Sequence, residues 1–320
     1  LKRGGLNEEA ASSSTPSTTA FSTIQMRGHS PAASRPAGDH EEQYHVVLQV
    51  IYSVVLLCGT ISLSLMMHAL KSSSVSATSI AVLNLIFAHF IFLITVPFRI
   101  YYYTTNQWVL GIEWCKMVSS MIHIHMFMSF VLYVIILISR LLTFYNRSAS
   151  LSSLQRTYAL IISALVWIVV LVTTPCIVHL SYGNKNDGNN TNSSTCFDFG
   201  EKIKAPPAKV FNYIVSTFII VVSIILMSLQ ANVLRILYRK YQKGCTSRQE
   251  FGAQLKSLCF ALIMVVCFVP YHIFRLYYLE NIHCQNENEV FLSVTTFNCL
   301  DMLTFMGRRT CSICSSCRTK

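Results

Sequence analysis

The chain has 320 residues, of which 52% are hydrophobic and only 12% are charged. Soluble domains usually carry about 25% charged residues, so a chain this apolar cannot cover its own surface with polar groups, and a lipid bilayer is its expected solvent. The net charge of +11 does not indicate nucleic-acid binding, because the basic residues lie mostly between and beside long apolar segments.

Residues 1–45 are rich in Ser, Thr, Ala and Pro. A segment of this composition has little apolar surface to bury, so we expect it to be extracellular and disordered. It contains no apolar stretch of the kind found in secretory signals, and no cleavable signal peptide is expected.

Seven apolar segments follow, most of them about as long as the roughly 20 residues that a helix needs to cross a bilayer. Backbone polar groups in lipid must be satisfied within the segment, so we expect helices. The sequence therefore predicts an all-α membrane protein, with a seven-transmembrane helix bundle over residues 46–306 and a short cytoplasmic tail over residues 307–320. The predicted spans are 46–70, 75–98, 114–144, 157–180, 210–238, 255–279 and 290–306.

Charge and glycosylation signals predict the orientation of these spans. With the amino end outside, the cytoplasmic segments hold more of the basic residues, among them Arg239 and Lys240, and their exposed acid is Glu250, in keeping with the positive-inside rule. Asn189 and Asn192 begin N-glycosylation sequons in the loop before the fifth span, which is then outside. We expect a multi-pass plasma-membrane protein with an extracellular amino end and a cytoplasmic carboxyl end.

The third span has a cysteine near its outer end and an arginine at its inner end. A disulfide between Cys115 and Cys196, in the long outer loop, would close about 80 residues and be worth roughly 4 kcal/mol by chain entropy; two free thiols are the alternative. Arg140 follows Cys115 by 25 residues, which is about 37 Å of helix and a full membrane crossing. A snorkelling arginine at the membrane edge is the alternative for Arg140.

The last two spans carry longer motifs. Residues 267–275 read Cys-Phe-Val-Pro-Tyr-His-Ile-Phe-Arg, and Pro270 should kink the sixth helix because it removes a backbone hydrogen bond. Residues 298–305 read Asn-Cys-Leu-Asp-Met-Leu-Thr-Phe. Together with the cysteines and the arginine of the third span, these strings resemble the rhodopsin-like G-protein-coupled receptors over about residues 46–317. The sixth-span string is similar to the branch that contains nucleotide, lipid-mediator and protease-activated receptors.

The resemblance implies an unidentified extracellular ligand and a heterotrimeric G protein as partners, with no cofactor. A ligand between the outer halves of the helices would favour a state in which the sixth helix swings outward around Pro270. Phe268 stands at the position where the family usually has its toggle tryptophan. Arg140 would lie at the floor of the cytoplasmic cleft that receives the G protein.

Several family positions are changed in this chain. The acidic-Arg-Tyr triplet is Ser-Arg-Leu at residues 139–141, and Met302 and Phe305 replace the proline and tyrosine of the seventh-span motif. His89 stands where the family usually has an aspartate, which removes one carboxylate from the usual sodium site. We hypothesise that His89 and Asp301 form a buried polar or ionic pair in place of sodium. The alternative is a neutral core histidine bonded to a backbone group or a hydroxyl.

The acidic neighbour that the family places beside Arg140 is missing. Glu250 lies at the cytoplasmic end of the sixth span, so we expect an Arg140–Glu250 pair that holds the inactive state. Such a partly solvated pair is worth about 1 kcal/mol.

The outer half of the bundle is expected to be basic and aromatic. No aspartate lies in the outer half of the third span, where amine receptors need a counter-ion, whereas arginines suit a phosphate, a carboxylate or a lipid acid. Alternatively, the arginines cap helix ends, pair with Glu280 or Glu113, or meet lipid headgroups. The candidate ligand-binding residues are Arg99, Tyr103, His123, Tyr271, His272 and Arg275.

Three cysteines follow the last span and are candidates for palmitoylation: Cys311, Cys314 and Cys317. A zinc site there would lack a clear fourth ligand, and no metal site is expected.

An enzyme is not expected either, because no paired carboxylates or nucleophile–base set shares one membrane depth. A channel or transporter would need polar residues aligned through several spans. The stronger rival is a receptor-fold protein that signals weakly or constitutively and acts as a partner of other receptors, which the changed motifs at 139–141 and 301–305 motivate.

Overall fold

The computed structural model describes residues 37–70, 77–145, 160–172, 196–197, 206–242 and 248–302. Within these residues every regular element is a helix. They are α1 (Ala37–Leu70), α2 (Ala77–Thr105), α3 (Ile112–Tyr145), α5 (Pro206–Gln242), α6 (Arg248–Tyr278), α7 (Gln285–Val294) and the 3₁₀-helix η3 (Thr295–Met302). A shorter apolar helix, Leu160–Val172, lies between α3 and α5 in the sequence.

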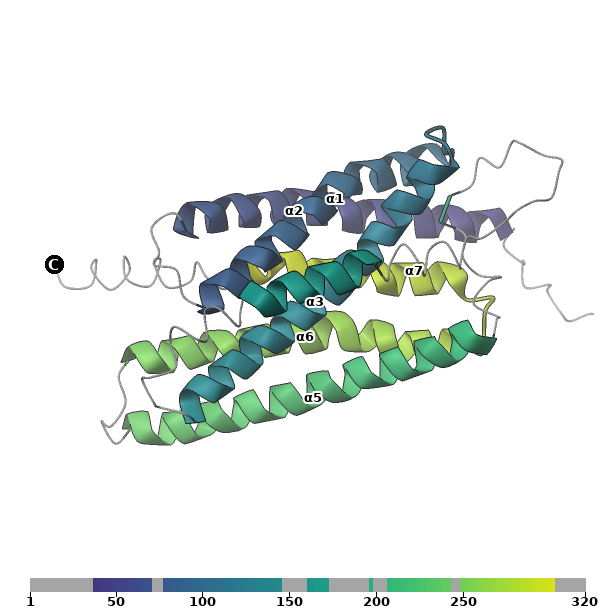
Figure 1. The fold of residues 1–320 in the computed structure, drawn as a ribbon. Coiled ribbons are helices and arrows are strands. Elements are labelled where there is room, and N and C mark those ends of the chain that lie inside the picture. Colours follow the sequence, from purple (N-terminus) through teal and green to yellow (C-terminus); the bar gives the residue numbers. More distant parts are fainter. Residues whose placement is uncertain are drawn as a thin grey trace, which may run out of the picture. The chain divides into compact units, whose positions relative to one another are not determined.

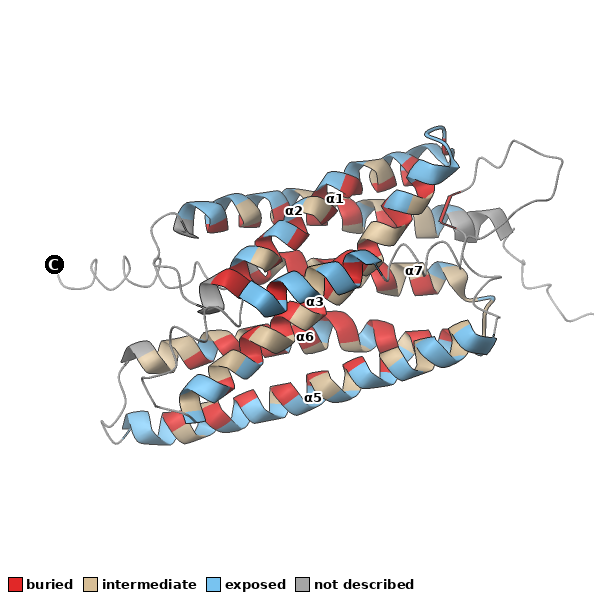
Figure 2. Cartoon of the chain, in the orientation of Figure 1, coloured by how far each residue is buried: buried red, intermediate tan, exposed pale blue. Residues whose placement is uncertain are grey.

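Five of the described helices are long and apolar enough to cross a membrane. Their outward faces carry large apolar side chains: on α5, Ile214 is 64% exposed, Phe218 59% and Ile225 52%. The exposed residues follow the outer sides of the helices in Figure 2. So much exposed apolar surface is unfavourable in water, and it confirms the predicted all-α, multi-pass membrane architecture.

The third helix links the two sides of the bundle. In Figure 1, α5 lies along α6, α2 crosses α1 at an oblique angle, and α3 runs obliquely between these two pairs. It packs against α2, α5, α6 and η3, and side chains along it, such as Val118, Leu132 and Tyr133, are fully buried. Polar groups on α3 can therefore reach partners on both sides of the bundle interior.

The first helix begins earlier than the sequence predicted. Residues 37–45, which were expected to be disordered, form the first turns of α1. Extending a nucleated helix costs little per residue, and the Tyr44 hydroxyl donates a hydrogen bond of 2.9 Å to Glu287 on α7. Contact with α7 thus stabilises the polar residues 37–45 at the start of α1.

The seventh span also differs from the continuous helix expected over 290–306. It starts at Gln285, and after Val294 it tightens into η3. The Thr295 and Thr296 hydroxyls donate to the carbonyls three residues earlier, at 2.6 and 2.5 Å. Side-chain bonds of this kind compete with regular α-helical hydrogen bonding, which gives a physical reason for the change.

Candidate functional site

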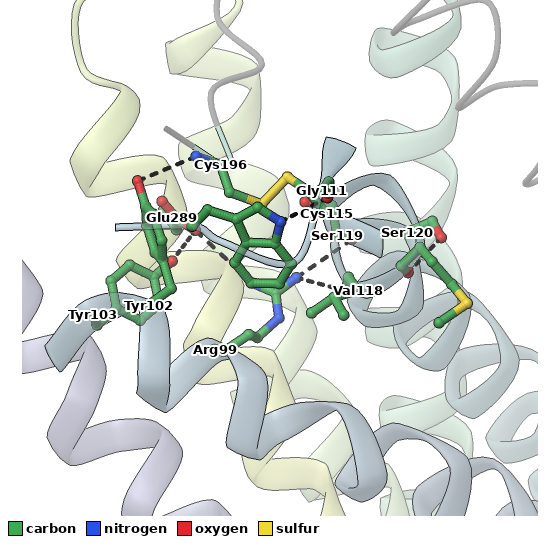
Figure 3. The surroundings of a disulfide bond; sticks show 12 residues. Arg99, Tyr102, Tyr103, Gly111, Cys115, Val118, Ser119, Ser120, Cys196 and Glu289 are labelled. Carbon is green, nitrogen blue, oxygen red and sulfur yellow. Dashed lines mark hydrogen bonds and ion pairs between the residues drawn. A yellow bond between two sulfur atoms is a disulfide. The ribbon is translucent and has the colours of Figure 1, made fainter. Parts of the chain in front are cut away.

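A disulfide ties Cys196, which precedes α5 in the sequence, to Cys115 of α3, as the sequence predicted. Cys115 and Cys196 are bonded, with their Cα atoms 5.9 Å apart. Figure 3 shows the bridge beside the outer ends of α2 and α3. Phe197 follows it with a φ of 70°, in the left-handed region that bulky side chains rarely adopt. Its ring lies against the guanidinium of Arg99, at 4.5 Å from the ring centroid.

Arg99 is buried, with 1% of its surface exposed. Its Nη2 atom donates to the carbonyl oxygens of Val118 at 3.1 Å and Ser119 at 3.4 Å on α3. Its Nη1 atom lies 3.4 Å from the Tyr52 hydroxyl and 3.9 Å from a carboxylate oxygen of Glu289. A predicted ligand-binding arginine is therefore also a structural link between α2, α3 and α7 (Figure 3).

Tyr103 lies one helical turn further out on α2 and shares this acidic partner. Its hydroxyl donates to Glu289, and its ring stacks on Tyr52 with the centroids 5.9 Å apart. Sequence reasoning missed Glu289 because the expected seventh span began at residue 290. The acids considered instead have other partners: Glu113 pairs with Lys116 at 2.9 Å, and Glu280 with Lys209 at 2.9 Å.

Arg275 on α6 is the second buried arginine of the outer half, and it is 9% exposed. Its Nε and Nη2 atoms donate to the side-chain oxygen of Asn212 on α5, at 3.2 and 3.1 Å, and Nη1 donates to that of Asn288 on α7, at 3.2 Å. Its guanidinium also faces the Tyr278 ring, at 5.3 Å from the centroid. Among the described residues, no carboxylate lies within ion-pair distance of Arg275.

The two arginines meet adjacent residues of α7. Arg99 approaches Glu289, and Arg275 donates to Asn288. Buried guanidinium groups need several acceptors to offset their desolvation, and α7 supplies acceptors to both. The outer ends of α2, α5 and α6 are therefore connected through one turn of α7.

The remaining candidate ligand-binding residues lie on α3 and α6. His272 is buried, and its Nδ1 atom lies 3.1 Å from the Ser216 hydroxyl on α5. Tyr271 is buried with its ring edge-on to His272, at 4.8 Å between centroids. His123 on α3 is partly exposed. Glu289 links Arg99 with Tyr103, and the Ser216 hydroxyl links His272 with α5.

An apolar groove runs along the outward side of α6 and contains none of the six candidates. Its lining is formed by Val265, Val266, Val269, Pro270, Ile273, Phe274, Tyr277 and Phe291. Such a surface suits lipid tails better than a polar ligand. Helix α6 continues through Pro270, where the missing N–H removes one internal hydrogen bond.

A buried polar cluster lies where α2, α3 and η3 meet. The Nε2 atom of His89 is 3.4 Å from the Asp301 carboxylate, and its Nδ1 atom is 2.8 Å from Nε2 of His125. The Tyr133 hydroxyl donates to Asp301 at 2.5 Å. Cys299 places its sulfur 3.6 Å from both histidines. His89 and Asp301 thus lie at the distance that the hypothesised pair requires.

Sequence reasoning missed three members of this cluster. His125, Tyr133 and Cys299 are all at most 2% exposed. A histidine within an apolar span is itself a signal, because polar side chains in membrane helices usually face the bundle interior. Which residues would converge there depends on the rotation of three helices, which the sequence alone does not give.

The remaining predicted switch residues are Phe268, which lies well inside α6, and Arg140 and Glu250, which lie near one end of α3 and α6. Phe268 is fully buried and meets Phe130 edge-on, at 6.0 Å between centroids. Arg140 and Glu250 are both partly exposed, and no ion pair joins them among the described residues. Glu250 lies in the first turn of α6, where the helix dipole favours a carboxylate. The expected latch is absent from this conformation, and its role in signalling stays a prediction.

The glycosylation and palmitoylation predictions fall outside the described residues. They concern Asn189, Asn192, Cys311, Cys314 and Cys317. The same holds for the segment before residue 37 and for the tail after residue 302. These assignments stay predictions.

Comparison with known proteins identifies relatives over most of the chain. Residues 59–306 match the family model described as "7 transmembrane receptor (rhodopsin family)". Probable G-protein coupled receptor 141 from Homo sapiens is 36% identical over 265 residues, covering 80% of this chain and 86% of the relative. Probable G-protein coupled receptor 34 from Mus musculus is 27% identical over 285 residues, covering 83% and 74%. The 2-oxoglutarate receptor 1 from Rattus norvegicus is 24% identical over 254 residues, covering 76% and 73%.

Proposed function

Because this chain belongs to the rhodopsin family of seven-transmembrane receptors, we propose that it is a plasma-membrane receptor that binds a small anion and activates heterotrimeric G proteins. The ligand site lies in the outer half of the bundle, and the G-protein site lies at the inner ends of α3 and α6. The amino end is extracellular and the carboxyl end is cytoplasmic.

One observation carries the choice of an anion. Arg275 is a buried cation whose acceptors are the neutral amides Asn212 and Asn288. A carboxylate or phosphate would bind a guanidinium with shorter and stronger hydrogen bonds than an amide does. Arg99, by contrast, already has a carboxylate, Glu289, at 3.9 Å. Arg275 is thus the better anchor for an incoming anion, and Arg99 shapes the site next to it.

The name of one relative supports the same chemistry. The rat relative is described as a receptor for 2-oxoglutarate, which is a dicarboxylate. At 24% identity the particular metabolite does not transfer to this chain. What we carry over is the class of ligand, a small organic acid, which agrees with the buried arginines.

The proposed mechanism couples this anchor to α6. An anion that binds Arg275 more strongly than Asn212 and Asn288 do would change how the outer end of α6 is tied to α5 and α7. A ligand shifts a two-state equilibrium only by its difference in affinity for the two states, and these exchanged hydrogen bonds supply that difference. Pro270 and the buried Phe268 lie one to two turns further along α6 and transmit the movement toward the inner end, where Arg140 contacts the G protein.

The test measures second-messenger output from cells that express the full chain, against a panel of small mono- and dicarboxylates and phosphate esters. Loss of a charged hydrogen bond costs about 1.5–3 kcal/mol, so Arg275→Gln should lower the potency of an active acid roughly 10- to 100-fold. Lys116→Gln is the matched control, because Lys116 is also a cation at the outer end of the bundle but pairs with the exposed Glu113. Arg140→Ala should abolish output at equal surface expression.

A result in which Arg275→Gln and Lys116→Gln change potency equally would refute the ligand site. If the chain reaches the cell surface but gives no output with any acid, the alternative gains support. In that alternative the chain signals weakly or constitutively and acts as a partner of other receptors, as the altered motifs at 139–141 and 301–305 suggest.

A further inference from the structure

Three ligand-type side chains converge in the buried polar cluster. The Nδ1 atom of His89, the Nε2 atom of His125 and the sulfur of Cys299 all lie within 4.8 Å of one another. The two nitrogens are 2.8 Å apart, and the sulfur is 3.6 Å from each. Each residue is at most 2% exposed, and they come from α2, α3 and η3. We propose that His89, His125 and Cys299 bind a zinc ion, with Asp301 as the outer carboxylate that orients His89.

The spacing of the donor atoms fits this metal. Zinc binds histidine nitrogen at about 2.0–2.1 Å and cysteine sulfur at about 2.3 Å in tetrahedral geometry, so two ligand nitrogens are about 3.3 Å apart, and nitrogen and sulfur about 3.6 Å. The two N···S distances of 3.6 Å already have that value. Only the N···N distance of 2.8 Å must lengthen, by about half an ångström, which small rotations of the two rings supply.

The type of donor excludes a hard cation. Sodium, magnesium and calcium prefer oxygen ligands, whereas imidazole nitrogen and thiolate sulfur favour zinc and its neighbours in the transition series. The three protein donors leave a fourth position for water, as in zinc sites that are not fully closed.

A second set of contacts matches what metal-binding histidines require. A histidine that binds metal through one ring nitrogen usually donates its other N–H to a carboxylate or carbonyl, which fixes the ring and its tautomer. Nε2 of His89 lies 3.4 Å from Asp301, which leaves Nδ1 for the ion. Tyr133 in turn donates to Asp301 at 2.5 Å, so the carboxylate is itself held in place.

The charges of the cluster also balance around a divalent ion. A net charge in the bilayer interior is costly unless it is paired. Zinc with the Cys299 thiolate and the Asp301 carboxylate sums to zero.

The cluster is not a closed hydrogen-bond network by itself. The side-chain amide of Asn298, which precedes Cys299, is buried and has no hydrogen-bond partner among the described residues. Buried polar groups without partners are rare and call for an explanation. Side chains that serve a bound ion and its water provide one.

The test uses the purified full-length protein in detergent, stripped with a chelator and then dialysed against zinc alone or cobalt(II) alone. We expect one metal ion per chain by elemental analysis and a thiolate-to-cobalt absorption band. Cys299→Ser should remove the band and weaken zinc at least tenfold. Asp301→Asn, which keeps all three ligands, should weaken zinc about 10- to 100-fold, the usual effect of losing an outer carboxylate.

Two controls separate this site from other cysteines. Cys259→Ser changes a partly buried cysteine of α6 outside the cluster and should leave the band unchanged. Replacing Cys311, Cys314 and Cys317 together with Ser tests whether the tail holds the metal. The variants must match the wild type in their size-exclusion profiles and in their thermal unfolding without metal. If Cys299→Ser does not fold, the zinc affinity of Asp301→Asn decides whether the cluster binds the metal.

Three outcomes would overturn the proposal: folded wild-type protein that takes up no zinc, a cobalt band that survives Cys299→Ser, or metal that disappears with the tail cysteines. The experiment needs neither ligand nor G protein, so its result is independent of the proposed receptor function.

Discussion

Replacing Tyr133 with Phe removes one hydroxyl from the centre of the bundle and nothing else. That hydroxyl donates to the Asp301 carboxylate at 2.5 Å and lies 3.3 Å from the Asn298 carbonyl oxygen. Tyr133 and Asp301 are both fully buried, so water cannot replace the lost bond. A hydrogen bond to a charged group contributes about 1.5–3 kcal/mol, and we expect Tyr133→Phe to cost about 2 kcal/mol.

The loss should lower the apparent midpoint of thermal unfolding in detergent by roughly 3 °C for a chain of this size, as followed by tryptophan fluorescence. Tyr271→Phe is the matched control, because Tyr271 is 3% exposed and its hydroxyl has no hydrogen bond within the part of the chain that the structure describes; its midpoint should move by much less.

A double-mutant cycle with Asp301→Asn isolates the contact. If Tyr133 acts through Asp301, the two substitutions together should cost less than the sum of the single effects. Equal effects of Tyr133→Phe and Tyr271→Phe, or strict additivity with Asp301→Asn, would refute the reasoning.

Three further predictions concern contacts at other depths of the bundle. Cys196→Ser should lower stability by up to about 4 kcal/mol and reduce surface expression, measured by antibody labelling of intact cells. Trp167→Phe removes the 2.9 Å hydrogen bond from the indole to Asn84 and should lower the free energy of unfolding by about 1 kcal/mol, measured by thermal unfolding. An unchanged unfolding midpoint would mean that this hydrogen bond is not formed in solution. Hydrogen bonds from Lys209 and Tyr213 hold the pKa of Glu280 below its ordinary value of 4.5. Its contribution to stability is therefore present above pH 4.5 and lost as pH falls through the lowered pKa; unfolding midpoints between pH 3 and pH 7 should show this loss in the wild type and not in Glu280→Gln.

The helical architecture was predictable because membrane helices are defined by local sequence. Each span needs only an apolar run of sufficient length, and the predicted disulfide partners Cys115 and Cys196 are bonded. Helix ends were less predictable. The polar start of α1 depends on contacts with α7, and the change to η3 depends on the Thr295 and Thr296 hydroxyls.

The candidate site could be predicted only in part. Residue types in the sequence show which chemical groups are available, but they do not show which of these groups come together in the fold. Arg99 and Arg275 were identified as candidate ligand-binding residues, yet their partners Glu289 and Asn288 precede the apolar run and were not considered. The cluster around His89 needed the rotation of α2, α3 and η3 to be known.

The central claim is that α6 moves relative to α3 when the receptor engages a G protein. Spin labels can be placed at the exposed positions Leu142 on α3 and Leu255 on α6. Genetically encoded amino acids carry the labels, so the native cysteines remain. Pulsed electron paramagnetic resonance then measures the distance between the two labels. Adding a nucleotide-free heterotrimeric G protein to the purified receptor should lengthen the distance, and Arg140→Ala should prevent the change. An unchanged distance in the wild-type receptor, with or without a stable complex, would contradict the account.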